Sequence, residues 1–174
     1  DSGVTLLVDL VSGLTVGVLA SLTLFIWRSS RPHIAVVGNV PGTEHYRNVL
    51  RHDVVTQPQV LGLRVDESLF FANARFLEDR VNHEVVARPQ LRHLVLQCTA
   101  VNDIDASALE TLLTLNRRLQ DAGVQLHLSE VKGPVMDRLQ RSDFLQQLSG
   151  RVFLTHHQAI TALDQQAPDP AAQI

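Results

Sequence analysis

Polar side chains that could take part in chemistry cluster in one short stretch after residue 100, comprising Asn102, Asp103, Asp105 and Ser107. The stretch follows an apolar segment, residues 92–98, and precedes a stripe of leucines at helical spacing. Two carboxylates beside a hydroxyl are compatible with three roles: a catalytic centre, the cap of a helix, or a serine that a partner phosphorylates.

Catalysis is the least supported of the three roles. The sequence around Ser107 lacks the G-x-S-x-G pattern of a nucleophile elbow. The eight histidines are scattered, and the adjacent His156 and His157 point to different faces of a helix, so no metal site is indicated. The glycines stand singly and form no phosphate-binding loop. We expect no enzyme, no metal and no cofactor, and we expect the histidines to be solvated or in loops.

A helix cap explains part of the cluster. Asp105 has the side chain of an N-cap residue, with Ala106 as the first helical residue. Glu110 lies three positions after Ser107, which is the spacing of a capping box, so either the carboxylate or the hydroxyl could satisfy the free backbone N–H groups. Capping accounts for one polar residue but leaves the others unexplained.

Composition indicates a globular domain with an appendage. Of 174 residues, 45% are hydrophobic and 19% are charged, and the formal net charge of −3 gives no broad attraction to nucleic acid. The single cysteine, Cys98, lies in an apolar run, so we expect a buried core residue in a reducing cytoplasm and no internal disulfide.

Residues 4–27 are mostly apolar, with Asp9 as the one charged residue, and predict a membrane-spanning helix. At ~1.5 Å per residue such a helix reaches roughly 36 Å, more than a hydrocarbon core of about 30 Å. Trp27 lies where an interfacial aromatic belongs, and the following Arg28 and Arg31 place that end in the cytoplasm. A signal peptide would have its basic residues before the apolar run. The alternative is an apolar helix buried in a soluble core.

The remaining sequence alternates strand and helix patterns and predicts an α/β fold with a small, largely parallel sheet. Between the first strand and residue 60 we expect irregular structure with one brief strand. The helix after Pro134 is expected to be interrupted near Ser142, and the tail, residues 167–174, to be disordered. The predicted strands are residues 32–40, 60–66, 92–98, 124–129 and 151–154, and the predicted helices are 72–86, 106–122, 134–148 and 156–163.

The order of these segments resembles a STAS domain, the fold of sulfate transporters and anti-sigma-factor antagonists. The resemblance is carried by "VNDIDASALETL", "NRRLQDAGVQLHLSEVKGPVMDRLQRSDF" and "VFLTHHQAITAL". With the preceding apolar helix, "RPHIAVVGNVPGTEHYRNV" and "RVDESLFFANARFLED", the chain resembles the C-terminal end of a SulP-type anion permease.

This resemblance implies an architecture. Residues 1–30 would be the last transmembrane helix of the transport domain, and residues 31–166 a cytoplasmic STAS domain with a mixed sheet packed by helices. The domain would regulate and scaffold a secondary transporter of sulfate, bicarbonate or a related anion, as a homodimer in the cell inner (plasma) membrane. The short connection between residues 86 and 92 is similar to compact bacterial members.

The resemblance also implies a role for Ser107. Stand-alone relatives carry Asp-Ser-Ser-Gly-Leu, in which a partner kinase phosphorylates a serine at the helix start. Here residues 105–109 are Asp-Ala-Ser-Ala-Leu, so Ser107 matches that serine while Ala106 and Ala108 depart from the pattern. The rival function is therefore a membrane-tethered switch, similar to an anti-anti-sigma factor, that binds a kinase; a carrier protein is a further candidate partner.

Two further contact regions are predicted. Phe70 and Phe71 are adjacent at a strand-to-helix junction and cannot both face one core, so we expect one of them to be exposed toward a partner. A basic juxtamembrane group could lie against anionic lipid or the transport domain; it comprises Arg28, Arg31, Arg47 and Arg51.

Overall fold

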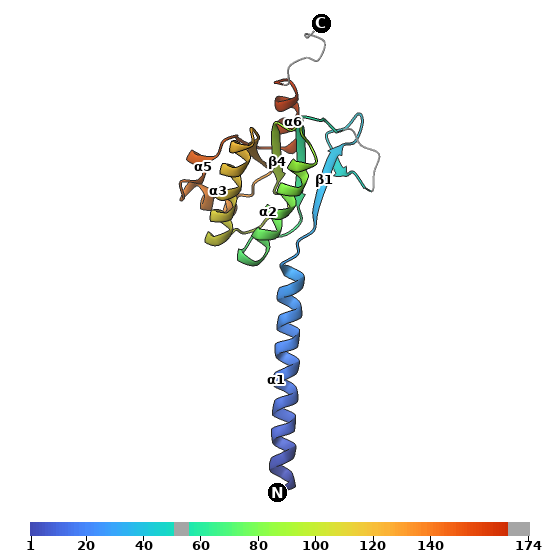
Figure 1. The fold of residues 1–174 in the computed structure, drawn as a ribbon, viewed down its shortest axis with the longest axis vertical. Coiled ribbons are helices and arrows are strands. Elements are labelled where there is room, and N and C mark those ends of the chain that lie inside the picture. The colour runs from blue at the N-terminus through green and yellow to red at the C-terminus, as the bar shows by residue number, and fades with distance from the viewer. Residues whose placement is uncertain (51–55, 167–174) are drawn as a thin grey trace.

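The computed structural model describes residues 1–50 and 56–166. One long helix, α1 (Ser2–Ser29), stands apart from an α/β body that contains all the other elements (Figure 1). In chain order these are β1 (Ile34–Asn39), β2 (Tyr46–Asn48), β3 (Val60–Val65), α2 (Phe71–Val86), β4 (His93–Gln97), α3 (Ala106–Asp121), β5 (Gln125–Ser129), α4 (Gly133–Gln140), α5 (Phe144–Gln147), β6 (Val152–Phe153) and α6 (His156–Asp164).

The described strands form one mixed sheet in the order β2-β1-β3-β4-β5-β6. Strands β3, β4, β5 and β6 are parallel, because each is followed by a helix that carries the chain back across the sheet. Strand β1 is antiparallel to both of its neighbours, β2 and β3. The predicted α/β fold with a largely parallel, mixed sheet is confirmed.

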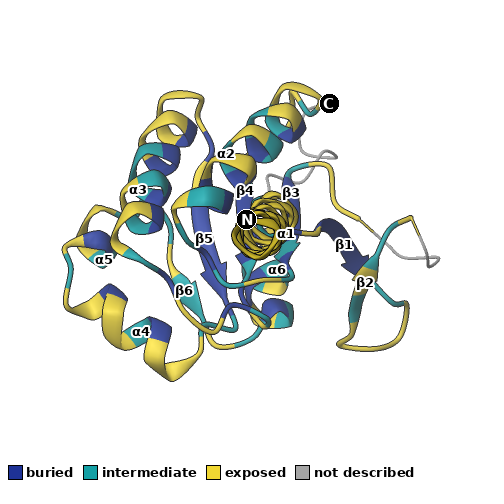
Figure 2. Cartoon of the chain, turned by 90° about the horizontal axis from the view of Figure 1, so that it is seen from below, coloured by how far each residue is buried: buried dark blue, intermediate teal, exposed yellow. Residues whose placement is uncertain are grey.

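The two faces of the sheet are covered differently (Figure 2). Side chains alternate along each strand, so Leu94 and Leu96 of β4 face the larger core, which packs against α2, α3, α4 and α5. Val95, between them, faces a small cluster with Ala159 and Leu163 of α6. A single helix therefore covers much of the second face.

The body follows the predicted element pattern closely. The helix after Pro134 is interrupted between Gln140 and Phe144, and the loop before β3 contains one short strand, β2. Gly123 ends the third helical region with a φ of 77°, a left-handed conformation that favours glycine. The predicted disordered tail, residues 167–174, lies outside the described residues.

Helix α1 is long and apolar enough to cross a bilayer, and none of its residues is buried. Within the described residues, α1 is therefore not folded into the core of the body. Two of its threonine hydroxyl groups are satisfied within the helix: Thr15 Oγ1 donates to the carbonyl of Val11, and Thr23 Oγ1 to that of Leu19, each at 2.8 Å. Such internal bonds suit an apolar environment without water.

The direction of β1 fixes which end of the sheet lies near α1. The chain leaves α1 at Ser29 and enters β1 at Ile34, so β1 runs away from the helix. Because β3 is antiparallel to β1, with Val65 opposite Ile34, the carboxyl ends of β3, β4 and β5 lie on the α1 side. We call the loops at these ends, residues 66–70, 98–105 and 130–132, together with the first turns of α2 and α3, the α1-side edge.

Candidate functional site

The predicted polar cluster lies on the α1-side edge, where two loops are bonded to each other. The backbone N–H of Leu69 donates to the carbonyl of Asp103 at 3.0 Å, and the N–H of Asp105 donates to the carbonyl of Leu69 at 3.1 Å. Leu69 and Ile104 form a parallel bridge and are both buried. The loop before α2 and the loop before α3 therefore behave as one short piece of sheet.

Asp105 caps two helices at once. Its Oδ1 accepts from the backbone N–H of Ala108 at 2.7 Å, which makes it the N-cap of α3, and its Oδ2 accepts from the N–H of Phe71, the first residue of α2, at 3.0 Å. Both N–H groups belong to helix starts that lack partners within their own helices. The predicted N-cap is confirmed, and the alternative box between Ser107 and Glu110 is not formed.

Ser68 and Lys132 hold the other polar residues of the cluster. The Oγ of Ser68 accepts from the backbone N–H groups of Asn102 and Asp103, at 3.1 and 3.2 Å. The Nζ of Lys132, just before α4, donates to Oδ1 of Asn102, and Arg138 Nε lies 4.0 Å from Asp103 Oδ1. Two cationic side chains from the α4 region thus reach toward this end of the sheet.

Ser107 lies in the first turn of α3 and is exposed. Among the described residues, its hydroxyl has no hydrogen-bond partner, and only its carbonyl is engaged, accepting from Thr111 Oγ1 at 3.0 Å. Ser107 opens onto a polar groove of about 570 Å³ between α2 and α3, whose lining includes Arg75, Glu110 and Arg118. The Arg118 guanidinium is paired with Glu78 of α2.

Phe71, whose backbone N–H is bonded to Asp105, is the exposed member of the phenylalanine pair. It is 69% exposed, whereas Phe70 is half-buried and packs edge-on against it, with ring centroids 5.9 Å apart. One phenylalanine was expected to face outward, and Phe71 does. The exposed ring and the Ser107 hydroxyl therefore belong to a single surface next to Asp105.

The four arginines of the basic group are not brought together. Arg28 ends α1, and Arg31 follows it with its guanidinium over the Trp27 ring, 4.7 Å from the centroid. Arg47 lies in β2 opposite Gly38, at the end of β1 that is farther from α1. Arg51 lies outside the described residues.

A different contact joins the start of β1 to the α1-side edge. His33 Nδ1 lies 2.5 Å from Asp66 Oδ2, and Arg64 Nε donates to Asp66 Oδ1 at 2.6 Å. Burial opposes ionisation of Asp66, but its bonds to Arg64 and His33 outweigh burial, so its pKa lies below the usual value. The composition of the sequence did not reveal this contact.

Two histidines contradict the expectation of solvated or loop positions. His127 of β5 and His156 of α6 are 1% and 2% exposed. The N–H of Arg151 donates to Nδ1 of His127, so Nε2 carries the proton and donates to Nδ1 of His93 at 3.1 Å. Burial, followed by the nearby His93 and Arg151, lowers the pKa of His127 to about 4.

His156 is buried beside the serine that ends β5. Its Nδ1 lies 2.8 Å from Ser129 Oγ, and burial lowers its pKa to about 4. Gly62 provides the space, because a Cβ there would lie 2.6 Å from His156 Nε2. The alternation of side chains along β5 and the adjacent His156 and His157 could have signalled this burial.

The remaining chemical candidates do not form a reaction centre. Cys98 is buried, as expected, and burial raises the pKa of its thiol to about 12, so it is a poor nucleophile. Within residues 1–50 and 56–166, no group of three or more His, Cys, Asp or Glu side chains could hold a metal ion.

The α1-side edge has the features of a contact surface: an exposed ring, a free hydroxyl and cations.

A family model described as the STAS domain matches residues 51–159 of the chain. The chain belongs to the STAS domain family. Among similar proteins, Sulfate transporter 1.3 of Arabidopsis thaliana is 29% identical over 168 residues, which cover 90% of this chain and 26% of the relative. This chain thus spans about a quarter of the length of the curated relatives it matches.

Solved structures share the STAS fold. The murine Solute Carrier 26 family member A9 anion transporter, in the inward-facing state, matches with a TM-score of 0.77 at 20% identity, over 88% of this chain and 25% of that one. The anti-sigma factor antagonist SpoIIAA in its unphosphorylated form matches with a TM-score of 0.54 at 12% identity, over 66% and 96%. The similarity to sulfate transporters indicates a STAS domain of the SulP type, and the chain is part of a membrane protein.

Proposed function

We propose that this STAS domain regulates and scaffolds a secondary anion transporter of the SulP type, with sulfate among the candidate substrates because the relatives are named as sulfate transporters. In this proposal α1 is the last span of the transport domain, residues 31–166 lie in the cytoplasm, and the intact protein is a multi-pass homodimer of the inner (plasma) membrane. The domain contributes contacts rather than a reaction step.

The observation that carries the proposal is the position of the α1-side edge. The segment 30–33 between α1 and β1 is short, so the carboxyl ends of β3, β4 and β5 lie on the α1 side, which in this proposal is the membrane side. Phe71 and Ser107 on that side are exposed, while the backbone around them is fixed by the two caps of Asp105. A rigid edge with an exposed aromatic ring suits docking against the transport domain.

The test is anion uptake by the intact transporter. Uptake of a panel of labelled anions is compared with and without the segment after Arg31, and with Phe71→Ser in the full-length protein. We expect truncation to lower uptake and Phe71→Ser to lower it at unchanged membrane abundance. Full uptake by both variants would contradict a regulatory role of the domain and docking through this edge.

A second candidate function is supported by the free hydroxyl of Ser107 and by the structural likeness to SpoIIAA. Here a kinase phosphorylates Ser107 and the new charge changes partner binding. A phosphate adds about −1.5 to −2 charges at the start of α3, where the helix N-terminus favours an anion. Mass spectrometry of the protein from its native membrane tests this candidate: an unmodified Ser107 under all growth conditions would exclude it.

A further inference from the structure

We propose that the end of the body farther from α1 binds a small amphipathic monoanion, a carboxylate on an unbranched aliphatic chain. A cavity of about 440 Å³ lies there, within the size range of small-molecule sites in proteins. It is separate from the α1-side edge, because its walls come from the last residues of β1, the first residues of β3 and the end of α2.

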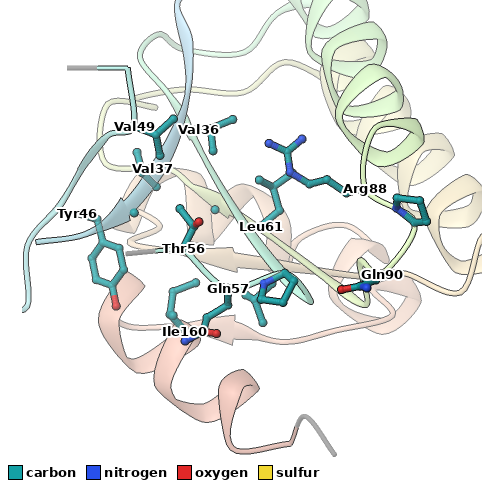
Figure 3. A pocket seen from close by; sticks show the side chains of 15 residues that line it. Val36, Val37, Tyr46, Val49, Thr56, Gln57, Leu61, Arg88, Gln90 and Ile160 are labelled. Carbon is teal, nitrogen blue, oxygen red and sulfur yellow. The ribbon is translucent and has the colours of Figure 1, made fainter. Parts of the chain in front are cut away.

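The cavity exists because β1 and β3 separate. Their pairing runs from Ile34 opposite Val65 only as far as Val37 opposite Gly62. Beyond that point β1 continues beside β2, while β3 remains paired with β4 through Val60 and Leu61. The gap is lined by residues from both faces of the sheet, so the cavity passes between the strands instead of resting on one face (Figure 3).

The walls select an aliphatic ligand. Six of the fifteen described lining residues are branched aliphatic, the largest single group, and Tyr46 is the one aromatic residue among them. A nucleobase would find no aromatic pair to stack between, whereas a flexible alkyl chain can fill a surface of methyl groups. The aliphatic lining residues are Val36, Val37, Val49, Val60, Leu61 and Ile160.

The charge of the site selects an anion. Arg88 is the one charged residue among the described lining residues, and its side chain points into the cavity (Figure 3). Glu84 is buried between Arg88 and Arg80, with Arg80 Nη2 2.8 Å from Glu84 Oε1. Two guanidinium groups share one carboxylate, so the group keeps one net positive charge. Among the described residues, that charge matches a monoanion better than a nucleotide polyphosphate.

The position of the cavity distinguishes a ligand that is free in solution from a lipid that stays in the bilayer. Gly38 of the lining lies four positions after Ile34, roughly 13 Å along a strand that runs away from α1. An acyl chain that stayed in the bilayer would not reach it. The occupant we infer is therefore free in solution.

The experiment uses the full chain in nanodiscs and decanoate that carries a diazirine on its terminal carbon. After irradiation, mass spectrometry locates the labelled peptides. We expect label on residues 36–49, 56–62, 88–90 and 160, displaced by decanoate but not by decyltrimethylammonium at equal concentration. Affinity should rise about fourfold for each methylene from hexanoate to decanoate. Label confined to residues 2–29, or equal displacement by the cation, would overturn the proposal.

Variants assign the two parts of the site. Arg88→Gln should weaken displacement of the label by decanoate at least tenfold, and Arg88→Lys, which keeps the charge, less than threefold. The matched control is Arg117→Gln, at an exposed position on α3, which should leave displacement unchanged. Ile160→Trp, at a half-buried lining position on α6, should fill the cavity and abolish labelling, and Ile160→Val should preserve it. Circular dichroism confirms folding of each variant. Unchanged binding in both Arg88→Gln and Ile160→Trp would disprove the site.

Discussion

The two faces of the sheet are stabilised by different physics. The face under α2 and α3 buries leucines and other apolar residues in one large cluster, and Asp105 caps both helices at its rim. The face under α6 has a four-residue apolar cluster and includes the buried His127 and His156. Apolar packing does not titrate, so between pH 7 and pH 5 the first face should depend less on pH than the second, which depends on neutral histidines.

Acidification should therefore have the largest effect, through the α6 face. The pKa values of His127 and His156 are lowered from 6.5 to about 4, so their stability contribution is complete above pH 6.5 and is lost as pH falls toward 4. From pH 7 to pH 5 we expect the free energy of unfolding to fall by about 4 kcal/mol, since each histidine contributes about 2.

Urea unfolding of the chain in nanodiscs, followed by circular dichroism, measures this loss. His93 and Arg151 face His127 and add to the lowering of its pKa, whereas burial alone accounts for His156. His156→Gln should remove about half of the pH dependence, and the exposed His45→Gln none of it. A stability that stays constant down to pH 5 would show that the two histidines are not buried in their neutral form.

The next largest effect should come from Asp105 at the rim of the other face. Asp105→Ala removes two caps and should lower the free energy of unfolding by about 2 kcal/mol, because one cap is worth about 1 kcal/mol. Ser107→Ala is the matched control and should change it by less than about 0.5 kcal/mol, as expected for an exposed side chain. Equal losses in the two variants would mean that Asp105 does not join α2 to α3.

The α6 face is also sensitive to the volume of one residue. Gly62→Ala places a methyl group 2.6 Å from His156 Nε2 and 3.0 Å from Val37 Cγ2, so we expect a loss of about 1–2 kcal/mol. Gly133→Ala, at the start of α4, meets no atom within 4 Å and should cost almost nothing. If Gly62→Ala is as stable as Gly133→Ala, His156 has room to move and its burial is looser than the structure indicates.

The same contrast explains what could be predicted from the sequence. The spacing of the leucines in α3 and β4 indicates which side of each element is buried, so the elements of the larger core were predictable. The N-cap Asp105 was predictable because its residue type and its position before the helix are local features. The second helix that Asp105 caps was not, because Phe71 N approaches it only after two loops pair. His127 and His156 resemble surface histidines in composition, and their burial depends on Ser129, Arg151 and Gly62, which are distant in sequence.

Tertiary contacts also decided which arginines lie together. Arg28 and Arg31 are neighbours because they are close in sequence, but Arg47 depends on the register of β2 against β1. The cavity between β1 and β3 has the same origin: it requires knowing where the pairing of two strands stops. Local sequence patterns predict helices, strands and caps, whereas the point at which two strands stop pairing depends on the whole sheet.

The smallest effect on stability should come from Ser107→Glu, and this makes it the sharpest test of the α1-side edge. A carboxylate in the first turn of α3 gains roughly 0.3–1 kcal/mol from the helix N-terminus, but Asp105 and Glu110 lie close by and oppose it. We expect the free energy of unfolding to change by less than about 0.5 kcal/mol. If the edge docks on the transport domain, anion uptake by the intact protein should nevertheless change severalfold, because a desolvated contact is far more sensitive to a new charge than an exposed helix turn. Ser107→Gln, of similar size and without charge, separates bulk from charge. Unchanged stability together with unchanged uptake would leave Ser107 as an ordinary surface residue next to a structural cap.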